Sequence, residues 1–484
     1  MSCFFPFRRL RVGFVTCALV LGLGGCWDST DGSGLDRRVF PTRGERSVSM
    51  APWLAGPRGT WPAAPTWELE RITTGVPWPR GIAMVDGRLV VLARGRHRRQ
   101  GGVDPAIVDR AGTLFWVDPK VAEPVVPGQA ASLAVSQNAK VLAEPSAPPF
   151  QLYDPKSGPP LRDTRMDRPY CTLAFDAASQ NLFLCGFSGV DLPFARFRKN
   201  ASDTIHRFDL RSQAWGLVEA RKPDELGESK LSYTVANRFY PHHDPATQPA
   251  PHGWLNGANS LCVVGDWLYA AGKDNHRIVA YDLHEVRADP QAGPPASRPV
   301  LGSSFLLRHG EGALEVDLYG PSALETRDDW LYIGFRTSCV VIRVPLDASG
   351  LPLADAPGEL LAVFEPWSST SRQSADVMDI KFSPKGELHV GCSRKGRIWN
   401  LGVPDGSRVL DGRWLSGAKP YISLPDLSGQ AKARIGNLTF DSDGGLYVCS
   451  GNYDASAGRP GYVGLPGVVY RITQHMLKRW HHTI

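Results

Sequence analysis

Four arginines are concentrated in one short stretch of the chain, RGRHRRQGG at residues 94–102. A guanidinium group presents a planar fork of donors that fits a carboxylate or a phosphate, so this stretch suits a small anion, an acidic glycan or a lipid headgroup. A solvated surface loop is the alternative, because no aromatic side chain is interleaved with the arginines. The candidate ligand-binding residues here are Arg94, Arg96, Arg98 and Arg99.

Imidazole and carboxylate side chains gather in RFYPHHDPATQPAPHGW, at residues 238–254. His242, His243, Asp244 and His252 are ligand types that Zn²⁺ prefers, and the three histidines are candidate ligand-binding residues. Their spacing matches no specific metal motif, and the surrounding prolines predict an irregular loop. A solvated loop is therefore the alternative interpretation.

The N-terminus has the pattern of an export signal. Three arginines precede an apolar run at residues 12–25 that is too short to span a membrane comfortably. The run ends in Leu-Gly-Gly before Cys26, which resembles the bacterial lipobox, in which the cysteine is acylated and becomes the mature N-terminus. We therefore expect an exported protein of the cell envelope, held at a membrane surface by a lipid on Cys26. A plain secretory signal with an incidental cysteine is the alternative.

The charge balance argues against a nucleic-acid partner. The formal net charge is +6, and removal of the signal takes away three arginines and no acids, which leaves +3. A strongly basic face is what nucleic-acid binding requires. We therefore expect the partner to be a protein, a glycan or a small anionic ligand, and not a nucleic acid.

Six cysteines remain when the signal and Cys26 are set aside, and an even number in an exported protein permits disulfide bonds. Cys171 and Cys185 flank the hairpin CTLAFDAASQNLFLC, where they can face each other across two strands. This predicts a disulfide bond between them, and the alternative is that both are small buried strand residues.

Short alternating strands joined by polar turns recur along most of the chain. The chain has 50 glycines and 40 prolines, which fits many short strands joined by turns. The recurring strand–turn–strand units are GIAMVDGRLVVLA, SLAVSQNAKVLAE, TLAFDAASQNLFLCG, SLCVVGDWLYAAG, ALETRDDWLYIGF, DIKFSPKGELHVGC and NLTFDSDGGLYVCS. Several turns contain Asp-Gly or Lys-Gly, which supply the positive φ that a tight hairpin needs.

These repeats predict an all-β fold, a β-propeller with seven blades. Each small antiparallel sheet has two apolar faces and cannot bury them alone, whereas a ring of sheets buries both. The second unit, at residues 132–144, is interrupted later by Pro145, Pro148 and Pro149, and proline cannot donate to a ladder. Six blades is therefore the alternative count.

The early part of the chain is predicted to close the ring. No fourth strand follows GVVYRIT at the end of the last unit, so Trp67 to Thr73 is expected to pair beside Val468 to Ile472 as the outer strand of the last blade. The stretch before it is rich in Gly, Pro, Ser and charge, which is typical of a flexible tether. The predicted parts are a signal at 1–25, a tether at 26–65, the propeller at 66–474 and a tail at 475–484.

Two units carry a family resemblance. KDNHRIVAYDL at residues 273–283 resembles the NHL repeat, whose signature runs from Asn-His-Arg-Ile into an aromatic residue and Asp. NLTFDSDGGLYV at residues 437–448 is similar to propellers of the NHL, TolB and gluconolactonase types. The resemblance implies a β-propeller but no single activity, because this fold carries enzymes, scaffolds and binding proteins.

Gluconolactonase-type propellers are lactonases or phosphotriesterases with a divalent metal at the hub, so the resemblance implies a hub site to test here. Their ligands are Glu, Asn and Asp near the start of the innermost strands. Alignment of the predicted first strands places Asn259, Asp379 and Asn437 there as candidate oxygen ligands of Ca²⁺, with Arg80 in the same ring as a candidate ligand-binding residue. A full acidic set is absent, and Asn or Asp at a strand start often caps the backbone.

The sequence therefore favours an exported, lipid-anchored β-propeller that acts as a ligand- or protein-binding module. The rival is a metal-dependent hydrolase of lactones or phosphoesters at the hub, in which the ion activates water. A structural part of an envelope assembly is a third interpretation.

Overall fold

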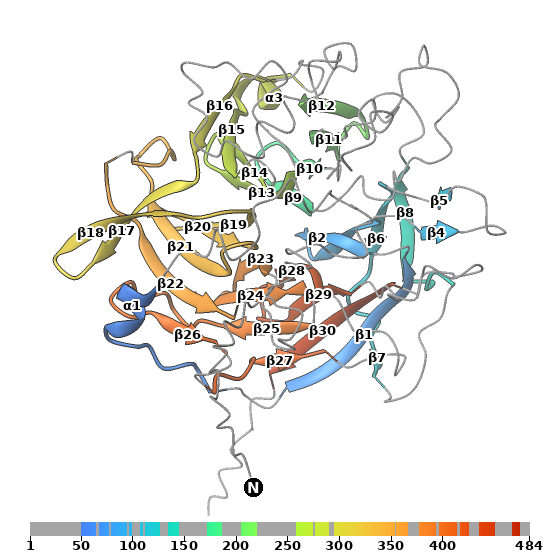
Figure 1. Ribbon diagram of the computed structural model, residues 1–484. Coiled ribbons are helices and arrows are strands. Elements are labelled where there is room, and N and C mark those ends of the chain that lie inside the picture. The colour runs from blue at the N-terminus through green and yellow to red at the C-terminus, as the bar shows by residue number, and fades with distance from the viewer. Residues whose placement is uncertain are drawn as a thin grey trace, which may run out of the picture.

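The computed structural model is built almost entirely from β-strands, arranged as small sheets around one axis (Figure 1). It describes residues 50–63, 67–76, 79–93, 96–98, 107–109, 112–125, 134–144, 172–185, 205–219, 258–273, 276–289, 295–353, 355–365, 377–393, 396–413, 417–424, 435–450 and 467–474. The helices in this part of the chain are α1 (Ala51–Ala55) and α3 (His284–Ala288). Within the described ranges, neither is long and apolar enough to cross a bilayer.

The first three blades are four-stranded antiparallel sheets that follow one another along the chain. Blade 1 consists of β2 (Pro79–Val85), β3 (Arg88–Ala93), β6 (Leu114–Val117) and β8 (Ala139–Ala143). Blade 2 consists of β9 (Thr172–Asp176), β10 (Asn181–Cys185), β11 (Ile205–Asp209) and β12 (Trp215–Glu219). Blade 3 consists of β13 (Ala258–Val264), β14 (Trp267–Gly272), β15 (Arg277–Asp282) and β16 (Ser297–Leu301).

The last three blades are built in the same way, and two of them gain an extra short strand at the outer edge. Blade 4 consists of β19 (Pro321–Arg327), β20 (Trp330–Phe335), β21 (Val340–Pro345) and β22 (Glu359–Phe364), with β26 (Leu410–Gly412) outside. Blade 5 consists of β23 (Val377–Phe382), β24 (Leu388–Cys392), β25 (Arg397–Asn400) and β27 (Ile422–Ser423). Blade 6 consists of β28 (Ile435–Phe440), β29 (Leu446–Ser450), β30 (Gly467–Gln474) and β1 (Trp67–Val76), with β7 (Glu123–Pro124) outside.

The ring closes between the two ends of the propeller. The inner strands of successive blades contact one another in order, and β28 of blade 6 contacts β2 of blade 1. Strand β1 pairs antiparallel with β30, with Leu69 opposite Ile472 and Thr74 opposite Val468. The predicted pairing of Trp67 to Thr73 with the last blade is therefore confirmed, with β1 as its fourth strand and the two-residue β7 outside it.

The predicted number of seven blades is wrong, and the alternative of six is the observed count. The second unit, at residues 132–144, contributes only β8, which pairs with β6 as the fourth strand of blade 1. The residues of β8 are exposed or half-buried, as expected at a sheet edge, so this strand has no second apolar face to cover with another blade. Turn chemistry inside the blades is as predicted: Asp86 and Gly87 have φ of 47° and 74° in the hairpin between β2 and β3.

Six clusters of buried apolar side chains hold the blades together, one at each of the six interfaces. Strand β3 shows how one sequence serves two of them. Val90 and Leu92 pack toward blade 2, whereas Leu89, Val91 and Ala93 pack toward blade 6. This alternation is the period of two of a β-strand, and it explains why the strands read as nearly continuous apolar runs.

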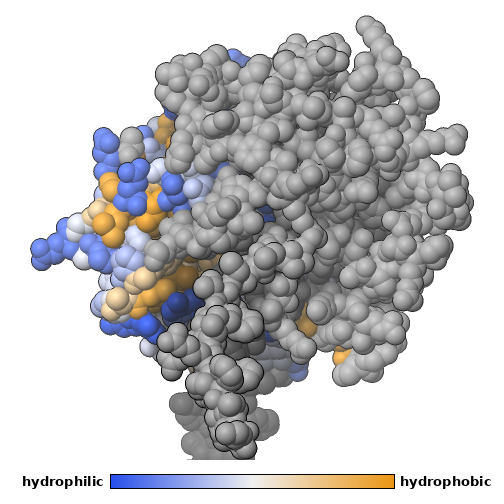
Figure 2. All heavy atoms as spheres, in the orientation of Figure 1, coloured by the Kyte–Doolittle hydropathy of each residue, from blue (hydrophilic) through white to orange (hydrophobic). Residues whose placement is uncertain are grey.

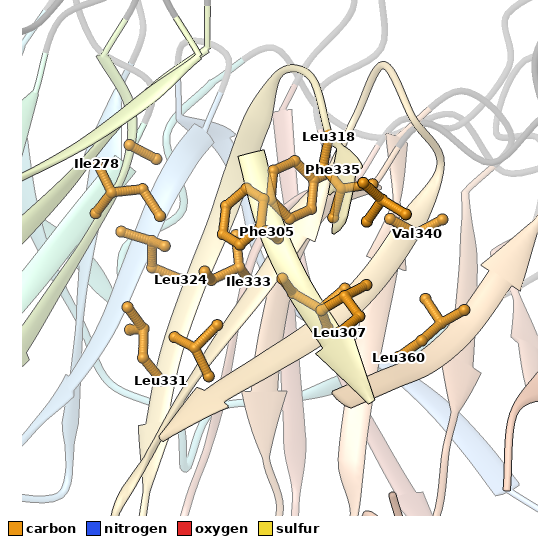
Figure 3. Close-up of a cluster of buried hydrophobic side chains, with 14 of the residues drawn as sticks. Ile278, Phe305, Leu307, Leu318, Leu324, Leu331, Ile333, Phe335, Val340 and Leu360 are labelled. Atoms are coloured by element: carbon orange, nitrogen blue, oxygen red, sulfur yellow. The ribbon is translucent and has the colours of Figure 1, made fainter. Parts of the chain in front are cut away.

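A projecting hairpin, β17 (Ser304–His309) and β18 (Gly312–Asp317), covers the interface between blades 3 and 4. Phe305 and Leu307 from this hairpin lie over Leu324, Ile333 and other side chains of the blades (Figure 3). Exposed and buried residues alternate along β17, so one face of the hairpin is part of the core.

Residues 50–63, here called the strap, pack on the outside of blades 4 and 5, although the sequence predicts a flexible tether for 26–65. Met50, Trp53 and Leu54 join the cluster under the hairpin, and Trp53 Nε1 donates to Arg308 O at 2.7 Å. Farther along, Gly59 N donates to Val409 O at 3.0 Å, next to β26. The strap therefore continues the sheet edge of blade 4 and joins it to the chain of blade 5.

Candidate functional site

The hub is lined by inner strands that share an irregularity at the same position. The pairing register of β2, β13, β19, β23 and β28 with the next strand shifts near the start of each strand, which marks a β-bulge. A bulge releases a residue from the ladder and re-aims its side chain. The residues at these bulges are Arg80, Asn259, Ser322, Met378 and the pair Gly436–Asn437.

These hub side chains bind to the neighbouring blades. Asn259 Nδ2 donates to Ser322 O at 3.0 Å, and Ser322 Oγ donates to Val377 O at 2.7 Å, so blades 3, 4 and 5 are linked in sequence. Arg80 Nη1 donates to Ile435 O at 3.2 Å, which links blade 1 to blade 6. Because Arg80, Asn259 and Ser322 are each 2% exposed or less, the bonds satisfy groups that are withdrawn from water.

Asp379 connects blades 5 and 6 and is the buried carboxylate of this ring. Its Oδ2 accepts the Leu438 N–H at 2.7 Å, and the Asn437 side chain also bonds to it. Burial raises the pKa of Asp379 to about 6, although the Lys381 ammonium and these two donors act in the opposite direction. The predicted site residues Asp379 and Asn437 are thus brought together, whereas Asn259 lies two blades away and bonds elsewhere.

Three residues farther along the inner strands lies a second polar group, which the sequence analysis missed. Lys381 pairs with Glu325 across blades 4 and 5, and the thiol of Cys262 lies 4.0 Å from Glu325 Oε1. Burial and the Glu325 carboxylate raise the pKa of Cys262 to about 12, so the thiol stays protonated and is a poor nucleophile. Cys262, Glu325 and Lys381 each follow the bulge residue of their strand by three positions. This shared spacing is the sequence signal that predicts the group.

The donor set at the hub fits Ca²⁺ poorly. Such a site takes six to eight oxygen ligands, commonly with several carboxylates. Among the described residues, no group of three or more His, Cys, Asp or Glu side chains is placed to hold a metal ion. Asp379 is bonded to two donors, and the unpartnered acceptor beside it is the buried Oδ1 of Asn437. The Ca²⁺ site therefore stays a prediction that the geometry does not strengthen.

The predicted loop sites fall largely outside the described residues. The backbone of Arg96 and Arg98 forms β4 (Arg96–Arg98), which pairs with β5 (Ile107–Asp109) in an insertion between β3 and β6 of blade 1. Arg94, Arg99, His242, His243, His252 and Cys26 lie outside the described part of the chain. Their roles stay predictions.

The predicted disulfide bond also stays untested, because Cys171 lies outside the described residues. Its partner Cys185 is buried at the end of β10, where the residue opposite it is Thr172, directly after Cys171. This register places Cys185 opposite Thr172 and not opposite Cys171, one residue away from the facing pair that the prediction assumed.

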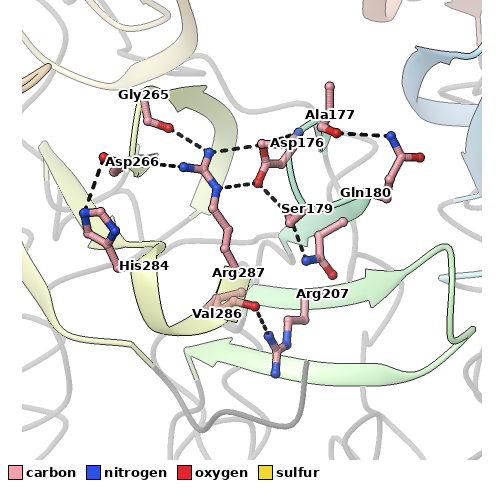
Figure 4. A network of polar contacts seen from close by, with 12 residues as sticks. Asp176, Ala177, Ser179, Gln180, Arg207, Gly265, Asp266, His284, Val286 and Arg287 are labelled. Carbon is pink, nitrogen blue, oxygen red and sulfur yellow. Dashed lines mark hydrogen bonds and ion pairs between the residues drawn. The ribbon is translucent and has the colours of Figure 1, made fainter. Parts of the chain in front are cut away.

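A polar network at the outer side of blades 2 and 3 is structural (Figure 4). Arg287 of α3 binds Asp176 through two nitrogens, at 2.9 and 3.1 Å, and it also binds Asp266 and Gly265 O. Although burial opposes it, bonding to Arg287 lowers the pKa of Asp176. The Arg287 guanidinium bridges the two carboxylates, so the network joins α3 to the end of β9 and to the turn that follows β13.

A cavity of about 570 Å³ lies between the strap and blade 5. Its wall includes Arg58 and Trp61 of the strap, Asn400 at the end of β25, Asp411 of β26, and Lys419 and Tyr421 before β27. Figure 2 shows apolar and hydrophilic surface intermixed on the side of the molecule where α1 lies. The sequence analysis missed this site, because it treated residues 26–65 as a tether. The signal was present in Trp53 and Trp61, two large aromatic residues in a Gly- and Pro-rich stretch.

Comparisons with known proteins identify no family, and the similar solved structures are distant. No description of a protein family matches the sequence, and no curated protein is similar to it. Among solved structures, a streptogramin B lyase matches with a TM-score of 0.40 and 10% identity, over 84% of this chain and 97% of that chain. The PQQ-bound aldose sugar dehydrogenase of Streptomyces coelicolor gives 0.41 and 14%, over 86% and 100%. A putative gluconolactonase gives 0.37 and 12%, over 88% and 97%.

The fold defines the chain as a six-bladed β-propeller. At these identities and TM-scores, the similarity to the lyase, the dehydrogenase and the lactonase gives no argument about activity. Function has to be argued from the sites themselves.

Proposed function

We propose that this chain is an exported, lipid-anchored β-propeller that acts as a binding module at a membrane surface. The observation that supports binding over catalysis is the use of the hub side chains. Arg80, Asn259, Ser322 and Asp379 all bond to a neighbouring blade, so their polar atoms hold the ring together. The ligand classes that the charge balance favours are a protein, a glycan or a small anion, with no nucleic acid.

A metal-dependent hydrolase at the hub is the second candidate, and one observation favours it. Asn437 Oδ1 is a buried acceptor without a hydrogen-bond partner among the described residues, and it lies next to a carboxylate whose pKa is about 6. A group that titrates near neutral pH is suited to general acid–base work. One carboxylate and one free amide oxygen are nevertheless a weak set for a divalent ion.

Metal analysis of the purified protein, combined with a screen of lactones and phosphoesters, separates the two candidates. The binding module predicts no stoichiometric divalent ion and no turnover. A bound ion with turnover that is lost in Asp379→Ala, but retained in a folded Lys385→Met control, would establish the hydrolase instead. Lys385 is exposed in a turn of the same blade, so it tests for unspecific effects.

Membrane attachment is tested through Cys26. We expect the wild-type chain to incorporate labelled palmitate and to sediment with membranes, whereas Cys26→Ser should stay unlabelled and remain in the supernatant. Equal sedimentation of both chains would contradict a lipid anchor at this residue.

A further inference from the structure

The cavity under the strap has fixed walls. The strap is attached by backbone bonding of residues 58 and 59 to Val409 and by Trp61 Nε1, which donates to Asp411 O at 3.1 Å. Arg58 is anchored as well, because Nε and Nη2 donate to Leu54 O at 3.3 and 3.2 Å. A volume of about 570 Å³ falls within the range of about 300 to 1,000 Å³ that is typical of small-molecule sites.

Two uncommitted hydrogen-bonding groups of this wall are donors, on Asn400 and Lys419. Asn400 is 3% exposed, and its Oδ1 accepts the Gly402 N–H at 2.7 Å, which fixes the amide group. The Nδ2 group of Asn400 has no partner among the hydrogen bonds of the described residues. Lys419 is exposed at the rim and forms no ion pair within the described part of the chain. These two residues can therefore donate to a ligand without breaking an existing bond.

The carboxylate of the wall is already neutralised. Arg413 binds Asp411 as a fork, with Nε to Oδ1 at 2.9 Å and Nη2 to Oδ2 at 2.8 Å, and Arg58 Nη1 lies 3.7 Å from Oδ2. Hydrogen bonding to Arg413 lowers the pKa of Asp411, so the carboxylate stays ionised and paired. Arg58 and Lys419 then leave the cavity with an excess of positive charge, which favours a negatively charged ligand.

An aromatic side chain supplies the remaining contact surface. Trp61 is half-buried, and its ring contacts Trp399 in a tilted arrangement, with centroids 5.0 Å and ring planes 49° apart, which supports the indole from one side. Aromatic faces beside amide donors suit the combination of apolar and hydroxyl-bearing faces on a pyranose ring.

We propose that this cavity is a binding site for an acidic sugar, whose carboxylate pairs with Lys419 and whose oxygens accept from Asn400 while the ring lies against Trp61. The inference rests on the proposed binding function and names a site and a ligand class for it. A free uronic acid and the end of an acidic glycan share this chemistry.

Saturation-transfer NMR with the intact protein tests the site, with glucuronic acid, an oligogalacturonate and glucose as the observed ligands and inorganic phosphate as an unobserved competitor. We expect both acidic sugars to bind, glucose to bind more weakly, and phosphate to give no competition at equal concentration. Lys419→Met should weaken glucuronate binding about tenfold, as expected for the loss of one charge-assisted bond. Asn400→Asp keeps the acceptor for Gly402 N–H but removes the donors, so it should weaken binding at least as much.

Two matched variants serve as controls. Lys385→Met removes an exposed charge elsewhere on blade 5 and should leave binding unchanged, and Lys419→Arg should restore most of it. Competition by phosphate as strong as that by glucuronate, or no binding of either acidic sugar to the folded protein, would overturn the sugar site. If neither Lys419→Met nor Asn400→Asp changes the affinity for glucuronate, the ligand binds elsewhere. That result would overturn this site but not the proposed binding function.

Discussion

The hub and the strap cavity contain the same kinds of side chains, yet they use them differently. At the hub, Arg80 is 2% exposed and bonds across the seam between the first and last blades. In the cavity, the Arg58 side chain is 55% exposed and bonds back to its own strap. Asn259 donates its amide to the next blade, whereas the Nδ2 group of Asn400 has no hydrogen-bond partner among the described residues. The difference is whether a polar group completes the fold or remains available to a ligand.

This contrast explains why the centre of the ring is not automatically the functional site. Six sheets that meet at an axis bring several backbone groups out of water, and each one needs a partner. Side chains at the bulges supply those partners, so a ring of Asn, Asp, Ser and Arg arises from the needs of closure. Side chains of the strap also bond to backbone carbonyl groups, but they lie outside the ring and are not needed to close it.

The largest expected effect is on stability, in Arg80→Ala. Removing this side chain empties its volume at the seam and leaves Ile435 O without its donor, which should cost about 3 to 4 kcal/mol of unfolding free energy. Arg58→Ala, which removes an exposed guanidinium, should cost less than about 1 kcal/mol. Urea unfolding of both variants measures the two values, and equal losses would contradict the distinction between hub and strap.

Much of the fold could be predicted from the sequence, because the ring depends on a local pattern. Alternation of apolar residues identified the strands, and the missing fourth strand after GVVYRIT located the closing partner at Trp67 to Thr73. The number of blades was harder to predict. The short alternating pattern of β8 is the same whether the segment starts a new blade or, as observed, completes blade 1. Which of the two forms depends on pairing with β6, a contact that local pattern does not encode.

The site was only partly predictable. Alignment of the inner strands found the correct ring positions for Asp379 and Asn437, but not that these residues bond to each other. The strap cavity combines residues about 340 positions apart in sequence, such as Trp61 and Asn400, and no spacing rule connects them. The packing of the strap on the propeller was not predictable from composition, because Gly and Pro are common both in a flexible tether and in an irregular segment that packs on a sheet.

Protonation offers a second comparison, beginning with Asp379 at the hub. Its pKa is raised to about 6 in the folded protein, so folding favours the protonated form. The contribution of Asp379 to the unfolding free energy is therefore complete below about pH 4 and is lost as the pH rises through 6. The loss is about 3 kcal/mol, because each unit of pKa shift corresponds to about 1.36 kcal/mol. Asp379→Asn should remove this loss. Unfolding free energies between pH 4 and 8 test it, and an unchanged pH dependence would contradict the burial of an ionisable hub carboxylate.

The opposite sign is expected for His389, which lies edge-on to Tyr421 of the cavity wall at 5.6 Å. Burial lowers the pKa of His389 to about 4, so folding favours the neutral imidazole. The contribution of His389 to stability is complete above about pH 6.5 and is lost as the pH falls through 4, by at most about 3 to 4 kcal/mol. His389→Gln should reduce acid destabilisation in this window, measured by the same titration. Greater acid sensitivity of the variant would refute the assignment.

A smaller effect is expected when the strap is loosened by Trp61→Ala. The change removes the tilted ring contact with Trp399 and the bond to Asp411 O, which should cost about 2 kcal/mol of local stability for a half-buried indole. Hydrogen exchange of Gly59 N–H should then speed up roughly 30-fold, whereas amides of the inner strands keep their protection. In Trp61→Phe, which retains an aromatic ring, the exchange rate of Gly59 N–H should lie between those of the wild type and Trp61→Ala. Exchange that accelerates equally at the hub would mean that strap and ring unfold together.

The smallest effect separates two lysines. Lys381 is partly buried at the hub and pairs with Glu325, whose side chain is 16% exposed, so Lys381→Met leaves a poorly hydrated carboxylate unpaired. Because the side chains of Lys381 and Glu325 are both partly exposed, Lys381→Met should lower the unfolding free energy by only about 1 kcal/mol. Lys419→Met at the cavity rim breaks no ion pair within the described residues, and it should change stability by less than about 0.5 kcal/mol. Thermal unfolding of both variants, with Lys385→Met as a common reference, resolves the difference. If Lys419→Met proved the more damaging change, Lys419 would already be engaged in the fold, and its charge would not be available to a ligand.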